Sequence, residues 1–401
     1  MGIAAGVNKK VSYKKEAVWG VAPANTGAKY LRRVESNLDL EKETYQSNEI
    51  RPDGQVADFR HGVRSVKGGV KGELSVGTYN DFFAAALRKD FAATATTGAV
   101  VVIAVTGTGT EFTRSAGSYL TDGFKIGDVV GATGYTDANN NDHYAMVTGL
   151  TATVMTAATL DGVALTDEAE GDTVTLALVG KKTLAATTGH TDDSFAMEHW
   201  FSDIAQSELY LGEKVESIKI GLPPSGMATI DLGFMGKGRQ NDTSEYFATP
   251  TPAGSDPVLA GVNGFVYVDG AAVALITGMD FDINTNLTAD PVVGSDEYPF
   301  IFRGRVLVSG NMSVYFQDAT FRDYFDNETE VAINAVFKGG SGKDTEFTSF
   351  IFPRVKAGGS SKDDGEKGVI QSVPFTALLN TAGGVGASTD NTTIAIQDSS
   401  A

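Results

Sequence analysis

The four histidines of the sequence are the side chains best suited to metal binding or acid–base chemistry. They lie at positions 61, 143, 190 and 199, and none stands in an HExxH or HxH arrangement, in which two imidazoles reach one metal ion. His199 is followed by Trp200, which favours a packed or interface role for this histidine. The histidine spacing therefore predicts neither a metal site nor a cofactor.

Two loops superficially resemble ligand-binding motifs. The run Asp137-Ala-Asn-Asn-Asn-Asp lacks the glycine at the sixth position and the glutamate at the twelfth that a calcium loop uses. In Gly340-Ser-Gly-Lys-Asp, Asp344 stands where a phosphate loop has Ser or Thr, and Phe337 stands where its first glycine belongs. We interpret the first as an Asn-rich turn and the second as a flexible loop.

Catalysis by serine or by carboxylates has no recognisable arrangement either. No GxSxG elbow is present, and the 50 acidic residues are interpreted as solvated surface charge. The net charge of -18 is dispersed along the chain, which argues against tight DNA binding because clustered Lys and Arg provide that affinity. The residues therefore predict a protein that is not an enzyme and that can surround DNA without gripping it.

Cysteine is absent, which excludes disulfides and fits assembly in a reducing cytosol. The N-terminal residues include lysines but no continuous apolar stretch, and no later segment approaches the roughly 18 apolar residues of a membrane span. We therefore expect a protein that is neither secreted nor embedded in a membrane.

Short alternating runs separated by Gly, Asn and Asp predict a mainly β chain. The clearest alternation places Val306, Val308, Met312, Val314 and Phe316 on one face and Arg305, Ser309, Asn311 and Ser313 on the other. A second copy of this pattern lies near residue 70, where Gly72-Glu-Leu-Ser-Val matches Gly310-Asn-Met-Ser-Val. Both runs predict half-buried strands.

The neighbours of these two strands repeat in the same order. Each strand is followed by a short aromatic stretch that could form a helix, Asn80-Asp-Phe-Phe or Arg322-Asp-Tyr-Phe. Each is preceded by a strand that ends in Ser36-Asn-Leu or Thr285-Asn-Leu, and by a long polar connection. This ordered correspondence favours a duplication over chance matches among common residues.

Residues 92–190 have no counterpart in the second copy and indicate an inserted β-module. The expected strands of this module are residues 100–105, 129–132, 144–148, 153–156 and 173–179. A module inserted in a loop usually projects from the surface. We therefore expect domains at 1–91 with 191–250, at 92–190, and at 251–401.

The two long polar connections carry aromatic side chains and turn sequences. Residues 41–63 contain Arg51-Pro-Asp-Gly, in which Pro fixes φ and Gly accepts positive φ. The second connection contains Pro291 to Gly294 and then Tyr298-Pro-Phe. Projecting aromatic hairpins suit docking onto a neighbouring subunit. The docking candidates are Tyr45, Arg51, Asp53, Phe59, Asp296 and Tyr298.

Three segments resemble the major tail tube proteins of siphophages, the phages with long non-contractile tails. They are Tyr13-Lys-Lys-Glu-Ala-Val-Trp-Gly-Val-Ala-Pro, Gly68-Gly-Val-Lys-Gly-Glu-Leu, and Phe124-Lys-Ile-Gly-Asp-Val-Val with the later Val147-Thr-Gly-Leu-Thr-Ala-Thr. The resemblance implies β-sandwich domains, each with a short flanking helix, whose inner sheets join into a barrel around a DNA channel. It also implies that the long loop stacks one ring on the next.

With this resemblance, the duplication predicts three chains in a pseudo-sixfold ring. Polar positions on the inner strands would then face the channel, namely Glu73, Ser75, Asp231, Asp282, Asn311 and Ser313. The expected partners are further copies of the chain, the tape measure protein, the tail terminator and the distal tail protein, while double-stranded DNA passes through without tight binding. The expected location is the virion tail, assembled in the host cytoplasm.

Three other classes share parts of this pattern. A porin-like barrel would need a signal peptide and aromatic girdles. A carbohydrate-active β enzyme would use an Asp/Glu pair and would hydrolyse glycans. A capsid decoration or fibre protein would share the composition but form no tubes.

Overall fold

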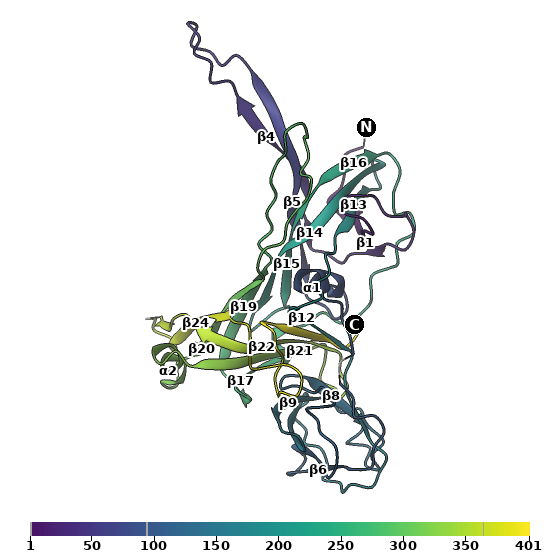
Figure 1. The fold of residues 1–401 in the computed structure, drawn as a ribbon, viewed down its shortest axis with the longest axis vertical. Helices are drawn as coiled ribbons and strands as arrows, with labels where there is room; N and C mark the ends of the chain where they lie inside the picture. Colours follow the sequence, from purple (N-terminus) through teal and green to yellow (C-terminus); the bar gives the residue numbers. More distant parts are fainter. Residues whose placement is uncertain (1, 94, 364) are drawn as a thin grey trace.

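The computed structural model describes residues 2–93, 95–363 and 365–401 and consists mainly of antiparallel strands (Figure 1). A long hairpin extends from one end of the molecule and a compact module from the other (Figure 1). Among the described residues, no helix has the length and apolar character that crossing a bilayer requires.

The first strand set is built from residues before and after the inserted module. Its strands pair in the order β1, β13, β14, β15, β5 and then β3 with β4. Their bounds are Lys9–Lys15 (β1), Phe195–Phe201 (β13), Gln206–Leu222 (β14), Thr229–Gly236 (β15), Phe59–Glu73 (β5), Glu35–Ser36 (β3) and Asp39–Gln46 (β4). The short strands β2 (Lys29–Tyr30) and β16 (Gly238–Asp242) pair with β1 and β14.

The second strand set repeats this order as β17, β21, β22, β24, β20 and β19. Their bounds are Gly264–Val268 (β17), Glu330–Lys338 (β21), Phe347–Ala357 (β22), Ile370–Ala377 (β24), Leu307–Tyr315 (β20) and Ile276–Asn284 (β19). The strands β18 (Ala271–Ala272), β23 (Ser361–Lys362) and β25 (Ala395–Asp398) lie beside β17, β24 and β22.

Short helices follow the matching strands, as expected from the aromatic stretches. They are α1 (Asn80–Leu87) after β5 and α2 (Thr320–Asp326) after β20. Each set also begins with the tripeptide Gly-Val-Asn in a 3₁₀ turn, η1 (Gly6–Asn8) before β1 and η2 (Gly261–Asn263) before β17. This second repeat was missed in the sequence, because three residues alone carry little signal.

The two strand sets are joined by pairing between β14 and β19, from Ser217 opposite Asn284 to Leu222 opposite Met279. This junction creates one continuous sheet, β3/β4–β5–β15–β14–β19–β20–β24, with the end of β22 at its far side; we call it the long sheet. One hydrophobic core runs through both sets and includes Phe82, Phe234, Phe281 and Phe350.

The inserted module forms a separate six-stranded sheet with its own core. Its strands are β6 (Ile103–Thr106), β7 (Glu111–Arg114), β8 (Val129–Thr133), β9 (Ala145–Leu150), β10 (Val154–Thr159) and β11 (Thr175–Leu178). The five expected strands are present, and β7 was missed because its four residues include two charges. The last strand of the expected range, β12 (Lys181–Leu184), pairs instead with β25.

Polar side chains bind the inserted module to the second strand set. Lys182 is fully buried, and its Nζ donates to Asp128 Oδ1 at 2.5 Å and to Asp390 Oδ2 at 2.9 Å. Burial by itself lowers the pKa of Lys182, but the two carboxylates raise it above its ordinary value. The amide of Gln397 bonds both the N–H and the carbonyl of Val129 at 2.8 Å. The module is therefore anchored to the second set.

The hairpin of β4 and β5 replaces much of the polar connection expected over residues 41–63. Gln46 pairs with Phe59, so regular pairing continues almost to the turn. At its other end β5 stops at Glu73, earlier than the alternation predicted. Beyond it Leu74 and Val76 are buried as expected, whereas Ser75 is also buried and bonds Thr78 Oγ1 at 2.7 Å.

Candidate functional site

One face of the long sheet is polar and hollowed. Alternation buries Ile218, Ile220, Ile230 and Leu232 and turns the residues between them to the other side. A hollow of about 720 Å³ on that side is lined by residues of β14, β15, β19, β20 and β24, among them Lys219, Asp231, Asp280, Asp282, Asn311 and Thr376. We call this surface the polar face.

Five of the six residues expected at a channel wall lie on the polar face. Asp231, Asp282 and Asn311 line the hollow. Glu73 and Ser313 occupy same-face positions further along β5 and β20. Ser75 does not belong to this group, because the strand has ended and the side chain is buried.

Charges of opposite sign alternate across the strands of the polar face. In one row Lys71 lies opposite Glu35 and Asp231, and Lys219 lies opposite Asp231 and Asp282. Burial raises the pKa of Asp282, and Lys219 opposes this shift. The sequence predicted carboxylates and neutral side chains on this face, whereas the structure also places lysines there, so that neighbouring charges offset one another.

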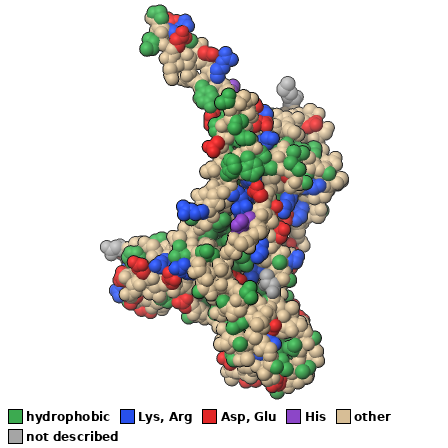
Figure 2. Space-filling view, in the orientation of Figure 1, with side chains coloured by type: hydrophobic (Ala, Val, Ile, Leu, Met, Phe, Trp, Pro, Cys, Tyr) green, Lys and Arg blue, Asp and Glu red, His purple; other side chains and the backbone are tan. Residues whose placement is uncertain are grey.

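The β4–β5 hairpin is the longest projection of the molecule (Figure 1). At its turn Arg51 forms an ion pair with Asp53 at 3.1 Å, and Gly54 has a φ of 68° that suits glycine. Apolar side chains on it are exposed, namely Tyr45, Ile50, Val56 and Phe59. Figure 2 shows hydrophobic, acidic and basic side chains together at this end. A surface of this mixed kind is typical of a protein interface.

The second long connection, residues 285–306, lies along the base of this hairpin. The N–H of Arg64 on β5 donates to the carbonyl of Asp296 at 2.8 Å, and its guanidinium pairs with Glu297. Burial raises the pKa of Tyr298, and the nearby Glu43 of β4 adds to this shift. The six docking candidates therefore lie along the whole hairpin, although they come from both strand sets. Arg51 and Asp53 are at its turn, Tyr45 and Phe59 are on its paired strands, and Asp296 and Tyr298 are at its base.

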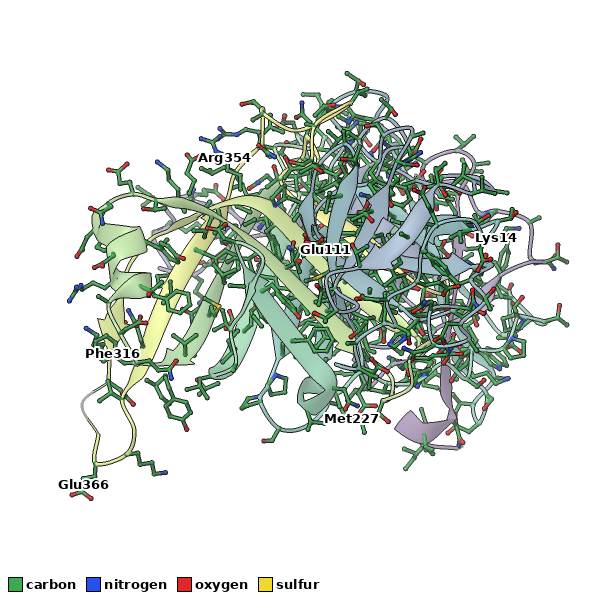
Figure 3. All side chains as sticks on the ribbon, turned by 90° about the horizontal axis from the view of Figure 1, so that it is seen from below. Lys14, Glu111, Met227, Phe316, Arg354 and Glu366 are labelled. Carbon is green, nitrogen blue, oxygen red and sulfur yellow. The ribbon has the colours of Figure 1, made fainter. Side chains whose placement is uncertain are left out.

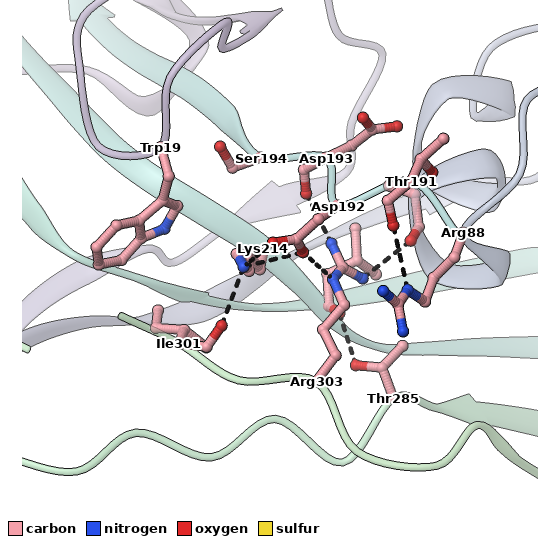
Figure 4. A network of polar contacts seen from close by, with 12 residues as sticks. Trp19, Arg88, Thr191, Asp192, Asp193, Ser194, Lys214, Thr285, Ile301 and Arg303 are labelled. Carbon is pink, nitrogen blue, oxygen red and sulfur yellow. Dashed lines mark hydrogen bonds and ion pairs between the residues drawn. The ribbon is translucent and has the colours of Figure 1, made fainter. Parts of the chain in front are cut away.

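A buried polar network fixes the connection at the β14–β19 junction (Figure 4). Lys214 Nζ donates to both oxygens of Asp192 at 2.9 and 2.8 Å and to the carbonyl of Ile301 at 3.0 Å. Arg303 also donates to Asp192, at 2.8 Å, and to the carbonyl of Ala85 at 2.9 Å. This network was not predicted from the sequence, in which a lysine within the apolar run of β14 was its only signal.

Two of the four histidines, His143 and His199, have hydrogen-bond partners that fix their side chains. His199 is buried and its Nε2 lies 2.7 Å from Ser36 Oγ; burial lowers its pKa to about 3. His143 Nε2 lies 2.8 Å from Asp161 Oδ1. In the part of the chain that the structure describes, no group of three His, Asp or Glu residues could hold a metal ion.

The comparison with protein families matches residues 6–377 to the phage tail tube protein family. No curated protein matches the chain. The match spans both strand sets, the inserted module and the junction between them, and it agrees with the siphophage tail tube resemblance at the level of the tail tube. The chain is therefore a member of the phage tail tube protein family, whose members are structural tail proteins.

Proposed function

We propose that the chain forms the tube of a siphophage tail by assembling into stacked rings around a DNA channel used for genome ejection. The observation that carries this proposal is the β14–β19 junction. It joins two strand sets of the same order edge to edge. A ring of such units needs this contact between each unit and the next. In this proposal residues 1–91 with 191–250 and residues 251–401 are two tube-type domains, and residues 92–190 form an outward-facing module.

Three chains would close a pseudo-sixfold ring. Each strand set supplies four segments to the long sheet: β3/β4, β5, β15 and β14 in the first, and β19, β20, β24 and the end of β22 in the second. Three chains then give about 24 strands, which at a spacing of about 4.8 Å and a tilt of about 45° close a barrel about 50 Å across. Side chains leave a channel of roughly 40 Å for a duplex about 20 Å wide.

The polar face would line this channel. Asp231 and Asp282 each lie opposite Lys219, so part of the lysine charge that could hold phosphate groups is offset within the wall. A ring closure also removes the free edges of the long sheet, which would otherwise promote uncontrolled association. DNA would therefore pass through without tight binding.

The hairpin end would contact the next ring. Its exposed apolar residues and the Arg51–Asp53 turn extend well beyond the body, so they can reach a neighbouring ring along the tube axis. The terminal rings would meet the tail terminator, the distal tail protein and the tape measure protein. In this proposal assembly takes place in the host cytoplasm and the finished location is the virion tail.

Negative-stain microscopy of the purified chain, with native mass spectrometry of its smallest ring, tests this function. The expected result is tubes with a central channel, built from rings of three chains. Rings of six chains would contradict the trimer alone. A chain that stays monomeric, even with tail initiator components, would contradict the tube.

A further inference from the structure

The junction within the chain has a fixed register and a charge pair on the polar face. Lys219 of β14 lies opposite Asp282 of β19. This pair is one of four consecutive antiparallel pairs that run from Ile218–Ile283 to Gly221–Asp280. Lys219 belongs to the sequence Lys-Ile-Gly, residues 219–221. The same junction between two chains would need one edge that resembles β14 and one that resembles β19.

The end of β22 corresponds to β14. Lys71 and Ser309 occupy equal positions in the repeated strands β5 and β20. In the first set Lys71 lies opposite Asp231 on the next strand, and Asp231 lies opposite Lys219 on the strand after it. In the second set Ser309 lies opposite Thr376, and Thr376 lies opposite Lys356. Lys356 thus occupies the place of Lys219, and it begins the matching sequence Lys356-Ala-Gly.

The strand around β3 corresponds to β19. Glu35 lies opposite Lys71, and Asp282 lies opposite Ser309, which is the position of β20 that matches Lys71. Glu35 is therefore the acidic counterpart of Asp282. Aligning Ser36-Asn-Leu with Thr285-Asn-Leu would instead match Glu35 to a residue two positions after Asp282. The counterpart is therefore identified by the strand pairing and not by this sequence match.

We propose that residues 354–359 of one copy pair antiparallel with residues 32–37 of a second copy, with Lys356 opposite Glu35. This inference rests on the proposed tube and adds its lateral contact. The occupant is a second copy because the chain carries both complementary edges and repeats the Lys–acid pair of its own junction. Val34 is an apolar side chain at this edge that a second copy would cover: it is 67% exposed, whereas its counterpart Phe281 is 2% exposed and packs against Phe350 and Phe352 of its own strand set.

The two edges lie on different sides of the molecule, which makes the contact head-to-tail. They are the two ends of the long sheet: β3 pairs with β5 at one end, and the last residues of β22 pair with β24 at the other. Figure 3 labels Arg354 of β22, on the side of the molecule away from Lys14 of β1. Head-to-tail contacts of one kind generate closed rings when the rotation between copies closes.

In the single chain the start of β21 partly covers the β22 edge. Glu330 lies opposite Lys356, and Lys356 Nζ lies 3.8 Å from Glu330 and 3.4 Å from Glu328. In the first strand set the chain before β13 instead turns away at Asp192, which binds Lys214. Pairing over residues 354–356 therefore requires residues 328–331 to leave this edge, and Glu35 of the second copy takes the place of Glu330.

Cysteine cross-linking tests the register directly, because the chain has no native cysteine. In the Glu35→Cys/Lys356→Cys variant, oxidation of assembled tubes should give covalent dimers and trimers on non-reducing gels. Two controls accompany it. Lys219→Cys/Asp282→Cys should form the matching disulfide within one chain, and Asn37→Cys/Lys356→Cys places same-face cysteines two residues out of register, where about tenfold less cross-linking is expected because the separation is too large.

Tubes that show no cross-link, or equal cross-linking in the offset variant, would overturn this contact and leave the tube intact. If the cysteine variants fail to assemble, charge exchange provides the readout: Glu35→Lys and Lys356→Glu should each reduce tube formation, and the double variant should restore it. Absence of restoration would again overturn the contact. Failure of the unmodified chain to form any ring would overturn the proposed function and this contact with it.

Discussion

The hairpin and the inserted module both extend from the body, but they are stabilised in opposite ways. The module buries its own core, including Phe112, Tyr119 and Phe124, and is anchored through Lys182. Along β4 nearly every side chain is exposed. Beyond its base, where Arg64 contacts the second connection, the hairpin has only its strand pairing and surface ion pairs. The module is thus complete within one chain, whereas the apolar surface of the hairpin is buried only if another molecule covers it.

Shortening the hairpin should separate assembly from folding most strongly. Replacing residues 48–57 with Asn-Gly would close a two-residue turn between Ser47 and Asp58, whose backbone groups already bond at 3.0 Å. We expect unfolding free energy to change by less than about 0.5 kcal/mol, because no buried side chain is removed. Tubes should be lost while single rings remain, as seen by electron microscopy.

A variant of full length controls for the shortened chain. Ile50→Ser with Val56→Ser keeps the hairpin and removes two exposed apolar side chains. It should shorten tubes without changing the thermal midpoint. Normal tubes from both variants would show that the hairpin is not a stacking element.

Removing the buried Lys182 should produce the largest loss of stability, and this loss should be greatest in the module. Lys182→Met leaves the carboxylates of Asp128 and Asp390 buried without their cation. Breaking such a buried pair costs about 3–5 kcal/mol, measured by chemical unfolding. Hydrogen exchange should increase in residues 92–190. The adjacent exposed Lys181→Met is the matched control, and equal losses in both variants would contradict the anchoring role.

Gln397→Leu should loosen the same anchor by a smaller amount. It removes bonds to the N–H and carbonyl of Val129 and to the carbonyl of Val179, all at 2.8 Å, and leaves these groups buried. The expected cost is about 1–3 kcal/mol. Gln240→Leu, at an exposed position of β16, should change the unfolding free energy little. A cost for Gln397→Leu no greater than for this control would show that the anchor does not depend on it.

Acid should slightly reduce the stability of the module. Burial alone would raise the pKa of Asp161, but hydrogen bonds from His143 and Val163 hold it below its ordinary value. A lowered carboxyl pKa stabilises the fold above the unfolded value of about 3.9, and this stability is lost as the pH falls below it. Thermal unfolding between pH 5 and 3 should therefore show a shallower pH dependence for Asp161→Asn than for the unmodified chain; parallel curves would contradict this.

Local patterns determined much of this protein. The alternation around Val308 and Met312, the aromatic stretches after each repeated strand, and the module strands are properties of neighbouring residues, so the sequence predicted them. The same alternation puts Asp231, Asp282 and Asn311 together on the polar face; that this face lines a channel stays a prediction. The hairpin end likewise followed from the exposed aromatic and turn residues.

Tertiary structure alone decided which distant segments meet. Ser75 is buried because β5 ends two residues earlier, which alternation does not reveal. The opposition of Lys219 and Asp282 and the anchoring of Lys182 by Asp128 and Asp390 join residues far apart in the chain. Strand register is set by the sum of packing and pairing across a whole sheet, so no local pattern contains it. The sequence therefore determined the kinds of surface, and the fold decided their partners.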